Sequence, residues 1–253
     1  MFRNIIKIFL FAALACTATI SNADRLGVRT TAGLWSAEYS GFVTDNGVVQ
    51  DSIDLKDDLN VRKNIQSFFY IFIEQENSVI PNFRIGKTNI RAKGSNKLTK
   101  SLAFNGVNYS FNENVDSELN LDHIEATLYW KFINHSDLRV DLGFTLKDFS
   151  GGVALTGDVS GNAQTELSEI VPLLYLGIET DLPLTALTIG FNASLLQIEQ
   201  GSLSDLLLFI RLEPFKYVGI EAGYRNFQIN VDTNEIKTQV NISGLYLSGF
   251  LYF

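Results

Sequence analysis

Apolar residues recur at every second position along most of this chain, in segments of about ten to fifteen residues. The clearest segment is DLRVDLGFTLKD, residues 137–148, in which the apolar positions are Leu138, Val140, Leu142, Phe144 and Leu146. Successive side chains of a strand point to opposite faces, whereas an amphipathic helix gathers its apolar residues at spacings of three and four. The segment therefore predicts a β-strand with one apolar face and one polar face.

The same alternation predicts ten strands in all. They cover residues 25–39, 65–76, 82–93, 118–133, 137–149, 167–181, 187–200, 203–213, 217–231 and 236–253. Tight turns alternate with longer links, which are most extended at residues 40–64, 94–117 and 150–166. Short turns on one side and long loops on the other are typical of outer-membrane barrels, whose even strand number leaves both termini in the periplasm. We therefore predict an all-β fold, a single up-and-down antiparallel transmembrane β-barrel of about 10 strands, with 8 or 12 as alternatives.

A soluble β-sandwich also alternates, so the aromatic residues bear on the choice. Trp130, Phe132, Phe215, Tyr217, Tyr252 and Phe253 fall at the predicted periplasmic ends of strands, and Trp35, Tyr39, Tyr224 and Phe227 fall toward the outer ends. Tyrosine and tryptophan favour membrane–water interfaces, because one end of the ring is apolar and the other is wet. Their positions favour a barrel in a membrane.

The first 23 residues have the form of a secretory signal peptide. Arg3 and Lys7 precede an apolar stretch too short to span a bilayer, and Ser21-Asn22-Ala23 forms a cleavage site. We expect cleavage after Ala23 and a mature barrel of residues 24–253, with a lipoprotein-type site at Cys16 as the rival interpretation. Cys16 is the only cysteine, so the cleaved chain would have no disulfide, thiol nucleophile or cysteine metal site. The net charge of −8 argues against nucleic acid as a partner.

The chain ends in the alternating run GLYLSGFLYF, in which Leu245, Leu247, Leu251 and Phe253 share one face. This run looks like the closing strand of a barrel, with the terminal aromatic signal that the barrel-assembly machinery recognises. Together with PNFRIGKTNI, ATLYWKFIN, RVDLGFTLKDFSGGV, VPLLYLGIETDLP and IEAGYRNFQINVD, it resembles a family of uncharacterised proteobacterial outer-membrane β-barrel proteins. The chain departs from that family at KFINH, where the family has a more acidic stretch, and at Ala186, where it has glycine. The resemblance implies outer-membrane lipid and lipopolysaccharide as surroundings, but no catalytic residue.

Charged residues on the inward-facing positions are balanced in sign. The predicted lumen network consists of Arg29, Glu125, Lys131, Arg139, Asp141, Lys147, Glu179, Asp205, Arg211, Glu213, Glu221 and Arg225. A barrel of this size is narrow, so opposite charges are expected to pair across it and stiffen a packed interior. The alternative is a narrow channel for ions or small solutes, whose selectivity these charges would set. Leu207 and Phe209 also point inward and favour a packed lumen.

Candidate catalytic and metal-binding residues are few. A rim hydrolase using His123 with Glu125 is a second alternative, since Asp122 points to the opposite face, but an ordinary exposed rim histidine is the simpler interpretation. The acidic stretch at residues 45–58 lacks EF-hand spacing and predicts a solvated loop. GGVALTG, residues 151–157, predicts a loop hairpin rather than a nucleotide site. We expect no metal and no cofactor.

The dipeptide Asn105-Gly106 predicts a further hairpin, which would extend beyond the membrane as an arm able to bind a partner. Together these features predict a non-enzymatic outer-membrane protein with a structural or surface-binding role. They leave its oligomeric state open.

Overall fold

The computed structural model describes residues 27–44, 52–75, 79–135, 137–232 and 237–253. The predicted signal peptide and its cleavage site lie outside these residues. No helix in the described segments is long and apolar enough to cross a membrane.

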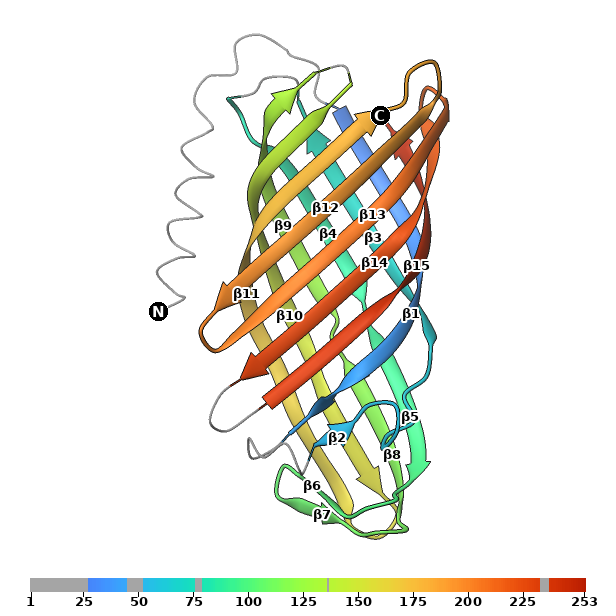
Figure 1. Ribbon diagram of the computed structural model, residues 1–253, viewed down its shortest axis with the longest axis vertical. Coiled ribbons are helices and arrows are strands. Elements are labelled where there is room, and N and C mark those ends of the chain that lie inside the picture. The colour runs from blue at the N-terminus through green and yellow to red at the C-terminus, as the bar shows by residue number, and fades with distance from the viewer. Residues whose placement is uncertain (1–26, 45–51, 76–78, 136, 233–236) are drawn as a thin grey trace.

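Ten strands of the described chain form one closed antiparallel barrel (Figure 1). They are β1 (Gly27–Val43), β3 (Asn64–Glu74), β4 (Asn82–Asn89), β9 (His123–Asn134), β10 (Arg139–Gly157), β11 (Gly161–Asp181), β12 (Leu187–Ile198), β13 (Gly201–Phe215), β14 (Val218–Asp232) and β15 (Lys237–Tyr252). Each strand pairs with its neighbours in chain order, and β1 closes the barrel by pairing with both β15 and β3. The predicted ten-stranded all-β barrel is confirmed.

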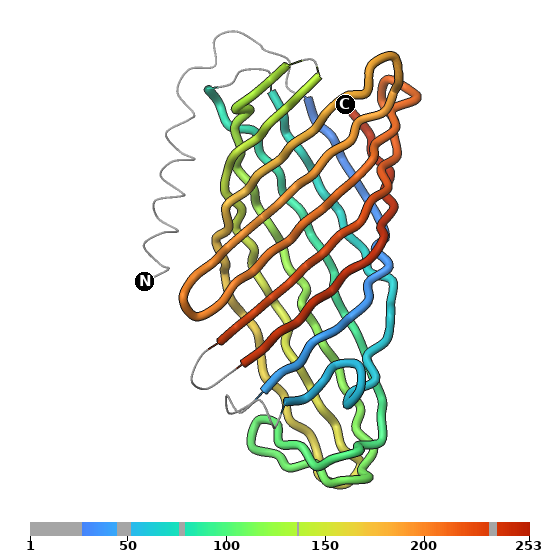
Figure 2. The backbone as a smooth tube through the Cα atoms, viewed as in Figure 1, coloured from blue at the N-terminus to red at the C-terminus, as the bar shows by residue number. Residues whose placement is uncertain are grey.

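Four strands continue beyond one end of the barrel, where the sequence predicted long loops. The extension consists of β5 (Arg91–Lys97), β8 (Asn114–Asn120), the last part of β10 and the first part of β11. The predicted long links at residues 94–117 and 150–166 consist largely of strands, and GGVALTG lies within β10 rather than in a loop hairpin. The strands, with their alternation of inward and outward side chains, continue beyond the end of the barrel, because pairing between β-strands does not require lipid. We call this end the extended end and the opposite one, where β1 begins and β15 ends, the terminal end (Figure 2).

The Asn-Gly hairpin is present as predicted. It joins β6 (Leu102–Phe104) to β7 (Val107–Tyr109), with positive φ angles of 45° at Asn105 and 77° at Gly106, as a tight hairpin turn requires. The hairpin is not a free arm, however. The Tyr109 hydroxyl donates to the Leu155 carbonyl at 3.0 Å, which holds the hairpin against the extension.

Residues 52–61 form an apolar cap at the extended end. This segment contains the short strand β2 (Ile53–Asp54), and Ile53, Leu55, Leu59 and Val61 are all buried. It is fastened to β5 because the Asn96 amide donates to the carbonyls of residues 57 and 58, each at 3.0 Å. The cap belongs to the same apolar cluster as the aromatic side chains of the barrel interior.

The acidic residues of this cap that the structure describes are used for folding. Asp58 is buried, accepts the Asp54 N–H at 2.9 Å and pairs with Lys100 at 2.9 Å. The Asp54 carboxylate in turn accepts the N–H groups of Lys56 and Asp57. The prediction of a solvated acidic loop is therefore wrong for residues 52–58, whereas residues 45–51 lie outside the described segments.

Glu113 fastens the tip of the extension. Its carboxylate accepts the N–H of Ser110 at 2.8 Å, the N–H of Val159 at 3.1 Å, and both the N–H and the hydroxyl of Ser160 at 2.7 Å. These donors, the Ser110 N–H foremost, favour the charged form and lower the pKa of Glu113 to about 2. The carboxylate thereby joins the loop before β8 to the β10–β11 turn.

The two faces of the barrel wall differ sharply in chemistry. The outer face carries exposed apolar side chains on many strands, among them Leu34, Ile85, Leu142, Leu174, Leu208, Ile220 and Leu247. An apolar surface of this extent is unusual for a protein that faces only water. The inner face carries the charged residues, and several inward glycines there leave space for aromatic rings: a methyl group at Gly86 would lie 2.1 Å from the Tyr70 ring.

The predicted placement of aromatic residues at the membrane interfaces holds in part at the terminal end, where Tyr252 borders the interior cavity instead, and fails at the other end. Phe132, Phe215, Tyr217 and Phe253 are exposed, whereas Trp35, Tyr39 and Phe227 are buried inside the barrel. Of the aromatic residues predicted for the outer end, Tyr224 is exposed. The error has a simple cause, because Trp35 is separated from the inward-facing Arg29 by an even number of positions and therefore shares its face.

Candidate functional site

A buried charge cluster centred on Lys147 lies inside the barrel. The Lys147 ammonium, on β10, donates to Asp205 Oδ2 on β13 at 2.8 Å and to Glu125 Oε2 on the neighbouring strand β9. It also lies 3.2 Å from His123 Nε2. All four side chains are at most 4% exposed. The alternation of β9, β10 and β13 aims these groups at the barrel axis, where closure of the sheet brings them together.

Two arginines complete this cluster on either side. Arg84, on β4, pairs with Glu125 at 2.9 Å. Arg225, on β14, donates two hydrogen bonds to the Asp205 carboxylate, from Nε at 2.9 Å and from Nη2 at 2.7 Å. The result is an alternating row of three cations and two carboxylates that crosses the lumen. Charges taken out of water are costly unless each is paired and hydrogen-bonded. Every charge of this row has an oppositely charged partner, although the Arg84 Nε atom has no hydrogen-bond partner among the described residues.

His123 acts within this cluster as a packed acceptor. Its ring lies 4.9 Å from that of Phe149 and stacks on that of Phe227 at 5.7 Å. Nδ1 is 3.0 Å from the Leu121 carbonyl, so the hydrogen-bond network assigns the proton to Nδ1 and leaves Nε2 to accept from Lys147.

The prediction of an exposed rim histidine is wrong. His123 is only 1% exposed, because it begins β9 on the inward face, and the solvent-exposed site that a rim hydrolase needs is not formed around it. Asp122 points away, as expected, and its carboxylate accepts the Ile90 N–H at 2.8 Å and pairs with Arg91 at 2.6 Å. The Asp122 side chain thereby links the residue between β4 and β5 to the two residues between β8 and β9.

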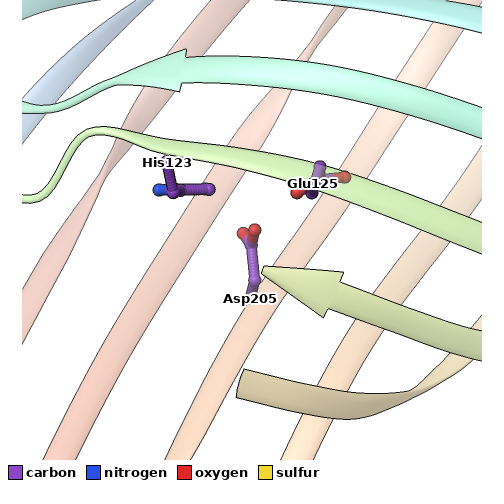
Figure 3. A group of neighbouring side chains, drawn as sticks. All are labelled: His123, Glu125 and Asp205. Atoms are coloured by element: carbon purple, nitrogen blue, oxygen red, sulfur yellow. The ribbon is translucent and has the colours of Figure 1, made fainter. Parts of the chain in front are cut away.

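The cluster also resembles a metal site in its donor atoms. Ligand atoms of His123, Glu125 and Asp205 lie within 4.8 Å of one another, and Figure 3 shows the three side chains converging. Histidine nitrogen and carboxylate oxygen are common zinc ligands. Here, however, the Lys147 ammonium contacts all three residues. The Lys147 ammonium therefore occupies the position between these three side chains at which a metal ion would bind.

A second charge cluster lies nearer the terminal end. Glu179 accepts from Arg139 at 3.0 Å and from Arg211 through two nitrogens, each at 3.0 Å. Arg211 also pairs with Glu221 at 3.0 Å, and Arg139 with Asp181 at 2.6 Å. This cluster links β10, β11, β13 and β14 across the interior.

The structure divides the twelve predicted lumen residues into three groups. Glu125, Lys147, Asp205 and Arg225 are in the first cluster, and Arg139, Glu179, Arg211 and Glu221 are in the second. Arg29, Lys131, Asp141 and Glu213 form no ion pair within the described part of the chain. Arg84 is absent from the predicted network, although it alternates in NFRIGKTN with the apolar residues Phe83, which is half-buried, and Ile85, which is exposed. That alternation marks Arg84 as inward-facing.

Comparison with known proteins bears on the fold. The outer membrane protease OmpT from Escherichia coli aligns with a TM-score of 0.53 and 8% sequence identity, over 94% of this chain and 100% of that chain. The fold is that of an outer-membrane β-barrel. The transport unit of the autotransporter AIDA-I from Escherichia coli (TM-score 0.40, 13% identity, 96% of this chain and 95% of that chain) and Ail from Yersinia pestis (0.36, 11%, 90% and 99%) are less similar and add nothing to this assignment.

The comparison corrects the expectation that the protein is not an enzyme. The barrel with the TM-score of 0.53 is a protease, so this architecture accommodates catalysis, and an outer-membrane barrel fold is no ground for excluding it. At 8% identity the similarity shows the fold alone and assigns no activity to this chain. No protein-family model matches the chain, and a search of curated protein sequences also finds no match.

Proposed function

We propose that the chain is an integral outer-membrane barrel with an interior closed to solutes, whose working surface is the extension beyond the barrel. The observation that carries this proposal is the charge row from Arg84 to Arg225, which crosses the lumen from β4 to β14. Phe209, which is 1% exposed, lies between Asp205 and Arg211 along β13 and fills the interior between the two charge clusters. The apolar cap of residues 52–61 covers the extended end. A solute would have to break buried ion pairs to pass, which argues against the narrow channel.

The outer wall supports the membrane placement. Its exposed apolar residues would contact outer-membrane lipid and lipopolysaccharide, and the exposed aromatic residues at the terminal end would lie at the periplasmic interface. Leu245, Leu247 and Leu251 line the outward face of β15, and Phe253 follows them. We propose that these four residues are the segment that the barrel-assembly machinery binds. In this orientation the extension, with the β6–β7 hairpin, faces the cell exterior.

Cysteine labelling on cells tests this orientation. Val159, in the β10–β11 turn at the extended end, is 82% exposed, and Leu184, in the β11–β12 turn at the terminal end, is fully exposed. A membrane-impermeant maleimide should label Val159→Cys on intact cells, but Leu184→Cys only after the outer membrane is permeabilised. The unsubstituted protein gives the background, because Cys16 lies in the segment expected to be removed.

The proposal fails if Leu184→Cys is labelled on intact cells as fast as Val159→Cys, or if Val159→Cys needs permeabilisation. Each variant must also migrate faster unheated than boiled on a gel, since a folded barrel resists the detergent until heated. A variant without that shift is replaced by a neighbouring position in the same turn.

A further inference from the structure

A polar cavity opens at the terminal end of the barrel. It has a volume of about 450 Å³ and is bordered by Arg29, Glu74, Lys131, Asp141, Glu213 and Tyr252, together with the second charge cluster. Cavities that hold small molecules span roughly 300–1,000 Å³, so this space suits a ligand of modest size. Two charged residues that border the cavity each have a buried polar atom without a hydrogen-bond partner in the described part of the chain.

The first is Arg29. It is only 5% exposed, its Nε atom has no hydrogen-bond partner, and it forms no ion pair with any described residue. Its guanidinium lies 3.8 Å above the Phe72 ring, which packs one face of the cation but provides no acceptor oxygen. A guanidinium offers five N–H donors in a planar fork that matches a carboxylate. Arg29 therefore borders the cavity with a buried N–H group that no acceptor of the described residues satisfies.

The second is Asp141. Its Oδ1 atom is buried without a hydrogen-bond partner, and Asp141 forms no ion pair within the described segments. Its cross-strand partner is Lys131, whose ammonium instead donates to the Gln75 carbonyl at 2.9 Å. Nearby Glu74 has one oxygen occupied by the Tyr129 hydroxyl at 2.6 Å. Asp141 therefore keeps one carboxylate oxygen that no donor of the described residues satisfies, although Lys131 and Arg139 also border the cavity.

We propose that this cavity binds a small zwitterion, an amino acid or short peptide with free termini, whose carboxylate contacts Arg29 and whose ammonium contacts Asp141 and Glu74. A simple anion would be repelled by Asp141, Glu74 and Glu213, and a simple cation by Arg29 and the neighbouring arginines. A zwitterion satisfies both unpaired groups and adds no net charge to a poorly solvated space. Its entry from the periplasm rests on the proposed orientation; its binding does not.

Capped dipeptides provide a matched set of probes. Isothermal titration calorimetry of the purified protein in detergent would compare L-alanyl-L-alanine with its N-acetyl form, its C-terminal amide and the doubly capped form. We expect the free dipeptide to bind at least about tenfold more tightly than either singly capped form, because each cap leaves one buried charge unpaired. The doubly capped form should bind most weakly.

Substitutions locate the site. Arg29→Gln and Asp141→Asn should each weaken binding of the free dipeptide by about tenfold, whereas Lys93→Gln, on the surface of the extension, should leave it unchanged. Equal affinity for all four probes, or no heat from any, would overturn the proposal. So would an N-acetyl form that binds as tightly as the free dipeptide, which would indicate a simple anion site. The probe series on the unsubstituted protein decides the matter if a variant does not fold.

Failure here and failure of the proposed function are separate results. Cysteine labelling reports which side of the membrane each end of the barrel faces, and its result does not depend on whether dipeptides bind. Calorimetry in detergent reports binding and is indifferent to orientation.

Discussion

Lys147→Met should reduce the free energy of unfolding by about 3–5 kcal/mol, since it removes three fully buried hydrogen bonds, two of them to carboxylates. Asp205 keeps Arg225 and Glu125 keeps Arg84, but each loses a fully buried hydrogen bond, and His123 loses the donor to its Nε2 atom. Methionine has a similar length and fills the space, so the loss is electrostatic rather than steric. Urea unfolding of the protein in lipid vesicles, followed by tryptophan fluorescence, measures it.

Lys93→Met is the matched control. Lys93 lies on β5, is 76% exposed and pairs with Glu118 at 3.3 Å on the surface of the extension. Exposed pairs of this kind contribute at most about 1 kcal/mol. Equal losses in the two variants would contradict the assignment of Lys147 as the central cation of the interior.

Phe227→Ala should cost about 3–5 kcal/mol, the usual range when a buried phenylalanine is truncated. The Phe227 ring is fully buried, stacks on His123 at 5.7 Å and lies 6.3 Å from the ring of Phe149. Alanine would leave a cavity beside the charge cluster, because a closed barrel wall cannot collapse into it. The same urea unfolding experiment measures the effect.

Phe132→Ala makes the identical chemical change on the outer face of β9, where the ring is 73% exposed. Its effect on unfolding should be clearly smaller. If Phe132→Ala cost as much as Phe227→Ala, the packed interior proposed for this barrel would be wrong.

Much of the fold could be predicted because strand alternation is a local property. Side chains two residues apart share a face, so Lys147 and Asp141 were assigned to the interior from DLRVDLGFTLKD alone. The same rule places Trp35 inside, against the general preference of tryptophan for membrane interfaces, and the structure follows the rule. The rule also cannot show where a barrel wall ends and an extension begins, because pairing continues unchanged from one to the other.

The contacts of the site depend on features that are not local. Glu125 and Lys147 are on neighbouring strands and face each other in the register of β9 and β10. Asp205 reaches Lys147 from β13, on another side of the barrel, and that contact depends on how the closed sheet curves. Pairing of Glu125 with Arg84 likewise requires that β4 lies next to β9, across a hairpin and two strand breaks. Sequence alternation supplies the inward direction of each group but not its partner.

Current through a single purified barrel in a planar lipid bilayer tests the closed interior most directly. The ion-paired lumen and the apolar cap predict insertion without discrete conductance steps, while the heat-dependent shift in gel mobility verifies that the protein added to the bilayer is folded. Reproducible steps would contradict the account, because ions would then be passing the charge row from Arg84 to Arg225 that is proposed to close the lumen. A step size that changes when the charge of Arg139 or Glu221 is reversed would show that this current runs through the barrel interior.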